Sequence, residues 1–195
     1  GPLTPSALEF SNTCPPDPYD APKAKRLRAE AGYPNGFDAG DLYPWPPYVS
    51  MGEAISGYLQ AVGIRTKVRT MERAALTTAW RDRKLKNVII GISGAGSNAS
   101  TRLEAYVSKD GAYTAGVIPE VEDHFQRQVR ELGVKKREAL LHQIQQILYD
   151  RVTHIPIYEL AFIWGVGPRV EEPGINLVRS FPYWAPLEDV KLKRP

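Results

Sequence analysis

The chain has 195 residues, of which 43% are hydrophobic and 24% are charged, and its formal net charge is +3. These values exclude a disordered chain, because disorder requires low hydrophobicity together with high net charge. The sequence contains no run of about 18 apolar residues, so no membrane-spanning helix is predicted. Its 16 glycines and 17 prolines exclude long coiled-coil heptads. The sequence therefore predicts one globular domain, with at most a small appendage.

Cysteine and basic residues narrow the function classes further. The single cysteine, Cys14, excludes an intramolecular disulfide and a zinc site built from cysteine clusters. The tightest basic runs, 81–86 and 135–137, are short, and acidic residues are interspersed along most of the chain. Because nucleic-acid binding usually needs a concentrated basic face, we expect no nucleic acid among the partners.

Helices and strands alternate over the first half of the chain. An extended lead-in over 1–19 precedes a helix that Asp20 caps and Gly32 ends. Further helices are predicted over 48–62 and 72–83, and strands over 37–43, 64–71 and 87–93. This order favours an α/β fold with a helix-covered, mixed but largely parallel sheet. The nearly continuous apolar run over 88–92 predicts a strand buried on both faces.

The second half of the chain is predicted to be mainly helical. Helices are expected over 101–107, from Pro119 onward and again after Gly133. Two short strands, 155–160 and 162–166, should follow, and 167–195 is punctuated by proline with one alternating segment near its end. The apolar stripe expected on the helix after Pro119 comprises Val121, Phe125, Val129 and Leu132.

No residue pattern predicts catalysis. The three histidines, His124, His142 and His154, have neither a cysteine nor a second histidine at metal-ligand spacing. Cys14 lies in a proline-rich segment without a recognisable base, and no Gly-x-Ser-x-Gly elbow is present. We therefore expect no enzyme activity, no metal and no cofactor.

A glycine-rich loop over 94–99 is the sharpest local motif. It matches G-x-G-x-x-G/A, follows an apolar strand and precedes a predicted helix, so its backbone amides are placed to hold an anion. However, a dinucleotide fingerprint normally opens its domain and is followed about 20 residues later by an acidic residue at a strand end. A nucleotide- or phosphate-binding enzyme domain that uses Gly94 to Ala99 is therefore kept as the alternative function.

Aromatic residues surround a second loop. Trp45 lies among prolines between Tyr43 and Tyr48, directly after a predicted strand. Aromatic rings in such a loop are able to wall a ligand cleft, or else to anchor the loop to the core. Both interpretations remain open from the sequence.

Several segments together resemble a known family. Residues 19–37 read Y-D-A-P-K-A-K-R-L-R-A-E-A-G-Y-P-N-G-F. They resemble the Y-D-P-x-K-A-K-x-L-L-A-E-A-G-Y-P-x-G-F segment of extracytoplasmic solute-binding proteins of family 5, the oligopeptide-, dipeptide- and nickel-binding receptors of ABC importers. Segments 55–68 and 137–158, and Trp184 with 187–192, are similar to later family motifs, so the resemblance covers about residues 19 to 192.

The resemblance implies one lobe of a type II periplasmic-binding-protein fold. Such receptors trap a small-molecule or oligomeric solute between two lobes and deliver it to an ABC permease, without catalysis, in a periplasmic or extracytoplasmic location. Because family members are usually more than twice this length, we expect a fragment. Residues 20–167 would form the C-terminal ligand-binding lobe, incomplete at its front, and 168–195 would return to a missing N-terminal lobe of the same chain.

A fragment of this kind has consequences for binding. Half of a cleft lacks the enclosure that gives affinity, so the isolated chain should bind solute weakly. It should also expose apolar surface where the missing parts dock, and we therefore expect self-association.

The resemblance also implies a ligand site after the strand over 88–93. Peptide-binding relatives carry an aspartate there that pairs with the peptide amino terminus, whereas this chain has no acid between Gly91 and Arg102. We therefore expect a neutral, hydroxyl-rich or anionic solute rather than a peptide with a free amino terminus. Arg102 is alternatively a helix-surface arginine. The predicted ligand-binding residues are Ser93, Gly94, Gly96, Ser97, Asn98, Arg102, Trp45 and Tyr43.

Overall fold

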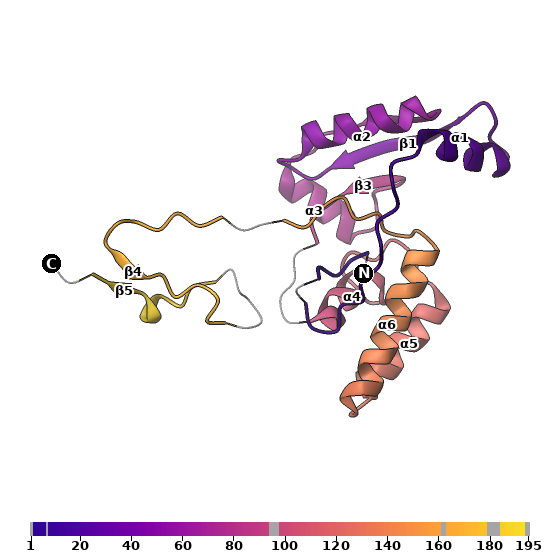
Figure 1. The fold of residues 1–195 in the computed structure, drawn as a ribbon. Coiled ribbons are helices and arrows are strands. Elements are labelled where there is room, and N and C mark those ends of the chain that lie inside the picture. The colour runs from indigo at the N-terminus through magenta and orange to yellow at the C-terminus, as the bar shows by residue number, and fades with distance from the viewer. Residues whose placement is uncertain (1, 7, 94–97, 161–162, 179–183, 194–195) are drawn as a thin grey trace. The chain divides into compact units, whose positions relative to one another are not determined.

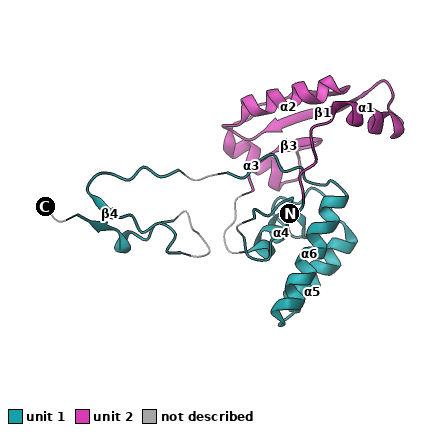
Figure 2. Ribbon diagram, viewed as in Figure 1, with its two compact units in different colours: residues 1–14, 94–195 teal, residues 15–93 magenta. Residues whose placement is uncertain are grey.

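The computed structural model describes residues 2–6, 8–93, 98–160, 163–178 and 184–193. The chain forms two compact units, one of residues 15–93 and one of residues 1–14 with 94–195 (Figure 2). Among the described residues, no helix has both the length and the apolar character needed to cross a membrane. The lobe boundaries expected at residues 19 and 167 stay predictions.

The unit of residues 15–93 begins with the helix that the sequence predicts most clearly. Helix α1 spans Ala21–Glu30, and the Asp20 carboxylate accepts a hydrogen bond from the Lys23 amide at 2.8 Å. Pro22 lies in the first turn, where no backbone donor is needed. Gly32 follows the helix at φ +93°, a conformation that glycine adopts without steric cost.

A three-stranded parallel sheet forms the centre of this unit. Strand β1 (Phe37–Pro44) lies between β2 (Ile64–Val68) and β3 (Val88–Ile90), and helices α2 (Val49–Ala61) and α3 (Arg73–Arg81) supply the connections (Figure 1). This confirms the α/β class and the largely parallel sheet. However, β3 is shorter than expected and only Ile90 is buried in it, so burial on both faces was wrong. In the described residues β3 pairs with β1 alone, and an edge strand has less cover.

Helix α2 packs closely on one face of β1. Leu42 is fully buried, and Pro44 is among the most deeply buried side chains. A Cβ atom added to Gly52 of α2 would lie 2.8 Å from the Pro44 Cβ. The close approach of helix and strand therefore requires glycine at position 52.

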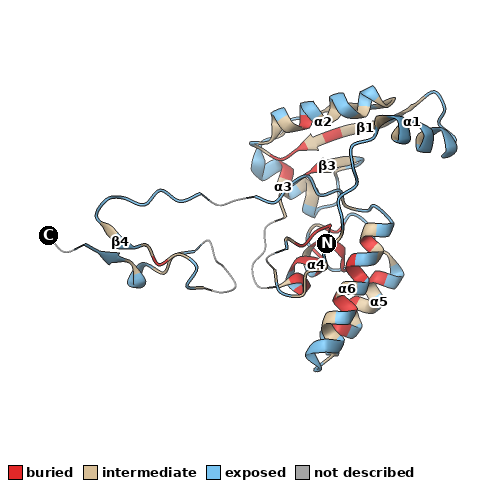
Figure 3. Ribbon diagram, in the orientation of Figure 1, coloured by how far each residue is buried: buried red, intermediate tan, exposed pale blue. Residues whose placement is uncertain are grey.

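Three helices form the core of the other unit. Helices α4 (Ala99–Val107), α5 (Pro119–Arg130) and α6 (Val134–Asp150) lie together, and Figure 3 shows buried residues along each. The stripe predicted on α5 was wrong in part, because Val129 and Leu132 are 59% and 97% exposed. The buried row is Val121, Phe125 and Gln128, which follows the spacing of one helical face.

The last third of the chain contains little regular structure. The strands expected over 155–160 and 162–166 were wrong for the described residues, none of which has a strand partner there. Instead, β4 (Val170–Glu172) and β5 (Lys191–Leu192) form a short antiparallel pair, with a 3-10 turn at Leu187–Asp189 between them. The late alternating segment of the sequence corresponds to β5.

The N-terminal strap, residues 1–14, is held on this helical unit by one buried side chain. Gln145 of α6 is fully buried, and its Oε1 accepts hydrogen bonds from the Thr4 hydroxyl (2.5 Å) and the Asn12 amide (2.8 Å). Its Nε2 donates to the carbonyls of Phe10 (2.9 Å) and Leu141 (3.0 Å). Because all four hydrogen bonds of the Gln145 amide are formed, its burial stabilises the unit. A buried amide without these partners would destabilise it.

Replacing Gln145 by Leu should loosen the strap. The change leaves the buried partners of the Gln145 amide unpaired, and we expect it to destabilise the unit by about 2 kcal/mol or more. Denaturant unfolding and amide exchange of the strap are the measurements. Gln146→Leu, at the exposed neighbouring position, is the matched control. Equal effects of the two substitutions would contradict this role for Gln145.

Candidate functional site

The topology of the sheet marks one edge as a candidate site. From β1 the chain crosses through α2 to β2, and it then crosses back through α3 to β3 on the other side of β1. Right-handed crossovers in opposite directions place their helices on opposite faces. The carboxyl ends of β1 and β3 therefore flank a topological switch point, where open α/β sheets bind ligands. The Trp45 amide donates to the Ile90 carbonyl there, at 2.7 Å.

Two tryptophans pack together at this edge. Trp45 follows β1 and is 8% exposed, and Trp80 of α3 meets it edge-on with ring centroids 6.3 Å apart. The Trp80 ring also lies over Gly91, where an added Cβ would be 2.5 Å from the Trp80 Cη2. The glycine after β3 therefore gives the indole the space it occupies.

The side chain of Arg73 lies over the Trp45 ring. Its guanidinium carbon lies 5.5 Å from the centre of the Trp45 ring, a cation–π distance, and the residue is exposed. The guanidinium makes no hydrogen bond or ion pair with any residue that the structure describes. The preceding Glu72 caps α3 by accepting from the amides of Ala74 (2.8 Å) and Ala75 (3.2 Å). These bonds hold the pKa of Glu72 below its usual value.

A second arginine at the same sheet is neutralised. The Arg69 Nε donates to the Asp41 carboxylate at 2.9 Å, and the Tyr43 hydroxyl donates to the other carboxylate oxygen at 3.2 Å. The Arg69 hydrogen bond lowers the pKa of Asp41, while burial and the Asp41 carboxylate raise the pKa of Tyr43. Asp41 and Tyr43 lie on the same face of β1, because alternate strand residues do.

The predicted ligand-binding residues fall in different parts of the structure. Tyr43, Trp45 and Ser93 belong to the unit of residues 15–93, at the carboxyl ends of β1 and β3. Asn98 and Arg102 belong to the other unit. Gly94, Gly96 and Ser97 lie outside the described residues, so the predicted loop as a whole stays a prediction.

Asn98 and Arg102 have structural contacts within their own unit. The Asn98 side chain caps α4 by accepting from the amides of Ser100 (3.0 Å) and Thr101 (3.4 Å). Arg102 is 5% exposed, and its Nη1 donates to the Leu3 carbonyl at 3.4 Å. The interpretation of Arg102 as a helix-surface arginine was therefore wrong, because the N-terminal strap covers it.

The start of α4 offers little to a phosphate. The Ala99 amide donates to the Glu9 carbonyl at 2.9 Å, and Asn98 occupies the next two amides. An anion at this helix end would have to displace these bonds, because a helix binds anions through free first-turn amides.

Two of the histidines lie beside groups of their own helices. His124 Nδ1 lies 2.7 Å from the Glu120 carbonyl, His142 Nε2 lies 4.0 Å from the Glu138 carboxylate, and Cys14 is a free thiol. No group of three metal-ligating side chains occurs within the described ranges.

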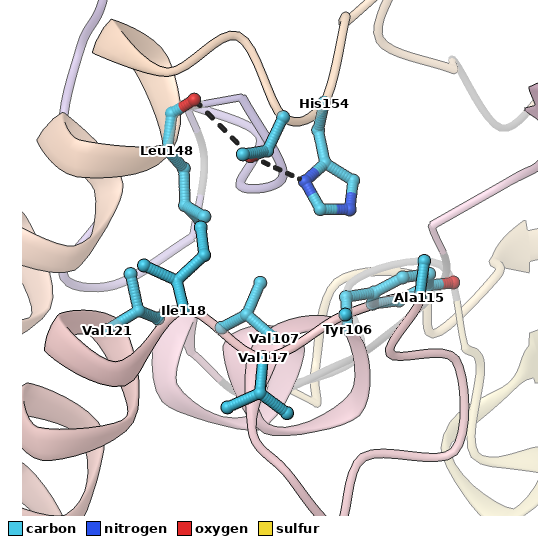
Figure 4. Close-up of a pocket in the computed structure, with 10 residues that line it drawn as sticks. Tyr106, Val107, Ala115, Val117, Ile118, Val121, Leu148 and His154 are labelled. Carbon is cyan, nitrogen blue, oxygen red and sulfur yellow. Dashed lines mark hydrogen bonds between the residues drawn. The ribbon is translucent and has the colours of Figure 1, made fainter.

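An apolar pocket of about 360 Å³ lies within the helical unit. Val107, Ile118, Val121 and Leu148 contribute to its apolar wall, and the His154 ring lies at its other side (Figure 4). Burial lowers the pKa of His154, whose Nδ1 is 3.1 Å from the Thr153 hydroxyl. The pocket contains none of the ligand-binding residues predicted from the sequence.

Sequence reasoning missed Arg73, Trp80 and Arg69. Arg73 and Trp80 lie on one helix and Trp45 lies about 30 residues earlier, so no local pattern links them. A βαβαβ order leaves the spatial order of the strands open, so the switch point follows only from the observed order β2-β1-β3.

Gly91→Ala should disturb the tryptophan pair. The added methyl group collides with Trp80, and we expect a loss of about 1–3 kcal/mol in stability together with altered tryptophan fluorescence. Gly57→Ala in α2 is the matched control, because its Cβ meets nothing within 4 Å and alanine favours the helix by about 0.5–1 kcal/mol. A Gly91→Ala variant as stable as wild type would show that the indole is not confined there.

Arg69→Gln should raise the pKa of Asp41 toward its ordinary value. In the wild type, the Arg69–Asp41 pair stabilises the fold at every pH above the ordinary pKa of a carboxyl group. This stabilisation is lost as the pH falls through the lowered pKa of Asp41. Carbon NMR of the Asp41 carboxyl group measures the change. Arg65→Gln removes the same charge from β2 and should leave Asp41 nearly unchanged.

Comparison with known proteins identifies a family and a relative. The family model for bacterial extracellular solute-binding proteins, family 5 Middle, matches residues 1–114, more than half of the chain. Heme-binding protein A of Haemophilus influenzae is 26% identical over 181 residues, which cover 87% of this chain and 33% of that protein.

Solved structures of two periplasmic or peptide binding proteins share the fold of this chain. The periplasmic binding protein DppA from Helicobacter pylori, in complex with the peptide STSA, is 24% identical with a TM-score of 0.69, covering 78% of this chain and 31% of DppA. A peptide binding protein AppA from Clostridium difficile is 13% identical with a TM-score of 0.73, covering 95% of this chain and 40% of AppA.

The chain thus spans between about a third and two fifths of the length of these proteins. Its α/β fold is that of type II periplasmic binding proteins. The family match and the shared fold lead to one conclusion: the chain belongs to family 5 of the bacterial extracellular solute-binding proteins.

Proposed function

We propose that the chain forms part of a two-lobed receptor that captures a solute outside the cytoplasm and delivers it to an ABC permease. Membership of family 5 is the observation that carries this proposal. In this function the protein binds and releases, and it transforms nothing. Lobes that close on a solute by hinge motion would give the permease a closed form to dock.

The solute in this proposal is not a peptide with a free amino terminus. An ammonium group in a closed cleft needs a carboxylate, because an unpaired buried charge costs several kcal/mol. At the described sheet edge the Asp41 carboxylate is occupied by Arg69 and Tyr43, and the Glu72 carboxylate caps α3. Residues 92–101 contain no acid. Family relatives in complex with peptides would differ in this respect.

The exposed apolar side chains of the last third support the expected lobe arrangement. Ile163, Trp184 and Leu187 are 94%, 63% and 86% exposed. Apolar surface of this kind usually marks an interface. In the proposed receptor, residues 168–195 pack on an N-terminal lobe of the same protein, and without that lobe the chain self-associates.

The complete gene product that contains this chain should not bind unmodified dipeptides tightly. Titration calorimetry with dipeptides and with their N-acetylated forms measures this directly. The ammonium group of an unmodified dipeptide finds no counter-charge, so acetylation should not weaken binding. Tight binding of the unmodified dipeptides would overturn the solute class.

The alternative function, a nucleotide- or phosphate-binding enzyme domain, is tested on the same complete gene product. NAD, ATP and inorganic phosphate should leave its melting temperature unchanged, because a ligand stabilises a protein only when it binds the folded state. A rise of several degrees would favour the nucleotide- or phosphate-binding alternative.

A further inference from the structure

We infer that Arg73, whose guanidinium lies over the Trp45 ring at the switch point, selects a solute that carries a carboxylate. The inference rests on the proposed solute-binding function and names the chemical class of the solute. It differs from the expectation drawn from the sequence, which assigned the cationic role to Arg102.

The stack prepares the guanidinium for a planar partner. With its carbon 5.5 Å from the Trp45 ring centre, the guanidinium is held over the aromatic face, and its hydrogen-bond donors lie around its rim. A carboxylate accepts two parallel hydrogen bonds from such a rim, a geometry that a lysine ammonium cannot reproduce. Keeping the guanidinium over the ring before the solute arrives reduces the conformational entropy lost on binding.

The other charged groups of this edge are already engaged. Arg69 donates to Asp41 at 2.9 Å, so its charge is compensated. Glu72, next to Arg73, directs its carboxylate to the amides of Ala74 and Ala75. Arg73 is exposed, and its guanidinium has no hydrogen bond or ion pair within the described residues. Arg73 therefore places a positive charge over Trp45 that no described carboxylate binds directly, although Glu72 acts on it through space.

The position of Arg73 connects it to ligand binding. Trp45 follows β1 directly and is bonded through its amide to the end of β3, so the arginine covers the residue that joins the two strands at the switch point. A solute bound at this edge would meet the guanidinium rim. An exposed cation–π pair adds little to the stability of a fold, so a structural role alone does not account for this arginine.

The test uses the complete gene product and a panel of acid and amide pairs: gluconate and gluconamide, hippurate and hippuramide, and N-acetyl-dipeptides with and without a free carboxylate. The variants are Arg73→Gln, Arg73→Lys and the matched control Arg65→Gln, which removes the same charge from an exposed position of β2. Calorimetry gives the affinity of each probe. Indole N–H shifts of Trp45 and Trp80 report whether the probe lies at this edge.

We expect acids to bind more tightly than their amides. Arg73→Gln should weaken acid binding about tenfold or more through loss of a charge-assisted bidentate pair. Arg73→Lys should restore part of the affinity, and Arg65→Gln should change it by less than about twofold because exposed charges at a distance are screened.

Amides that bind as tightly as acids, with no effect of Arg73→Gln, would overturn the inference while leaving solute binding intact. Acid binding that survives Arg73→Gln would also overturn it. Failure of every probe, and of a broad extract of small solutes, to bind the gene product would contradict both the inference and the proposed function.

Discussion

The parallel pairing of β1 between β2 and β3 is the constraint on which the sheet unit depends. Parallel strands cannot be joined by a tight turn, so each connection needs a long crossover, which α2 and α3 supply here. Because β2 and β3 lie on opposite sides of β1, the two crossovers run in opposite directions and their helices cover opposite faces. This order places the carboxyl ends of β1 and β3 side by side, where the Trp45 amide donates to the Ile90 carbonyl.

Charge pairing gives that edge its chemical character. Asp41 and Arg69 compensate each other, and Glu72 is consumed by the helix cap. What remains is Arg73, which lies over the buried Trp45, whose ring packs edge-on against Trp80. In the proposed function this edge would favour negatively charged or hydroxyl-bearing groups over ammonium groups, because the former would find hydrogen-bond donors there.

The helical unit uses buried polarity for a different purpose. Gln145 and Arg102 bind backbone carbonyls of the N-terminal strap, so residues 1–14 are held by polar contacts at the centre of α-helical packing. The same strap supplies the Glu9 carbonyl to the first amide of α4. The glycine-rich loop is thus followed by a helix end that is already satisfied, which explains why a motif suited to phosphate in isolation is less suited to it in this fold.

The sequence by itself determined the elements whose causes are local. Asp20, Pro22 and Gly32 set the ends of α1, the apolar periodicity placed α2 and α6, and the motif of residues 19–37 indicated the family. Contacts between distant residues decided the rest. The burial of Gln128 rather than Val129 and the Arg73–Trp45 stack depend on which surfaces meet. So does the absence of strand pairing over 155–160. A one-dimensional pattern records what each residue prefers, whereas the tertiary structure decides which partner is there to satisfy it.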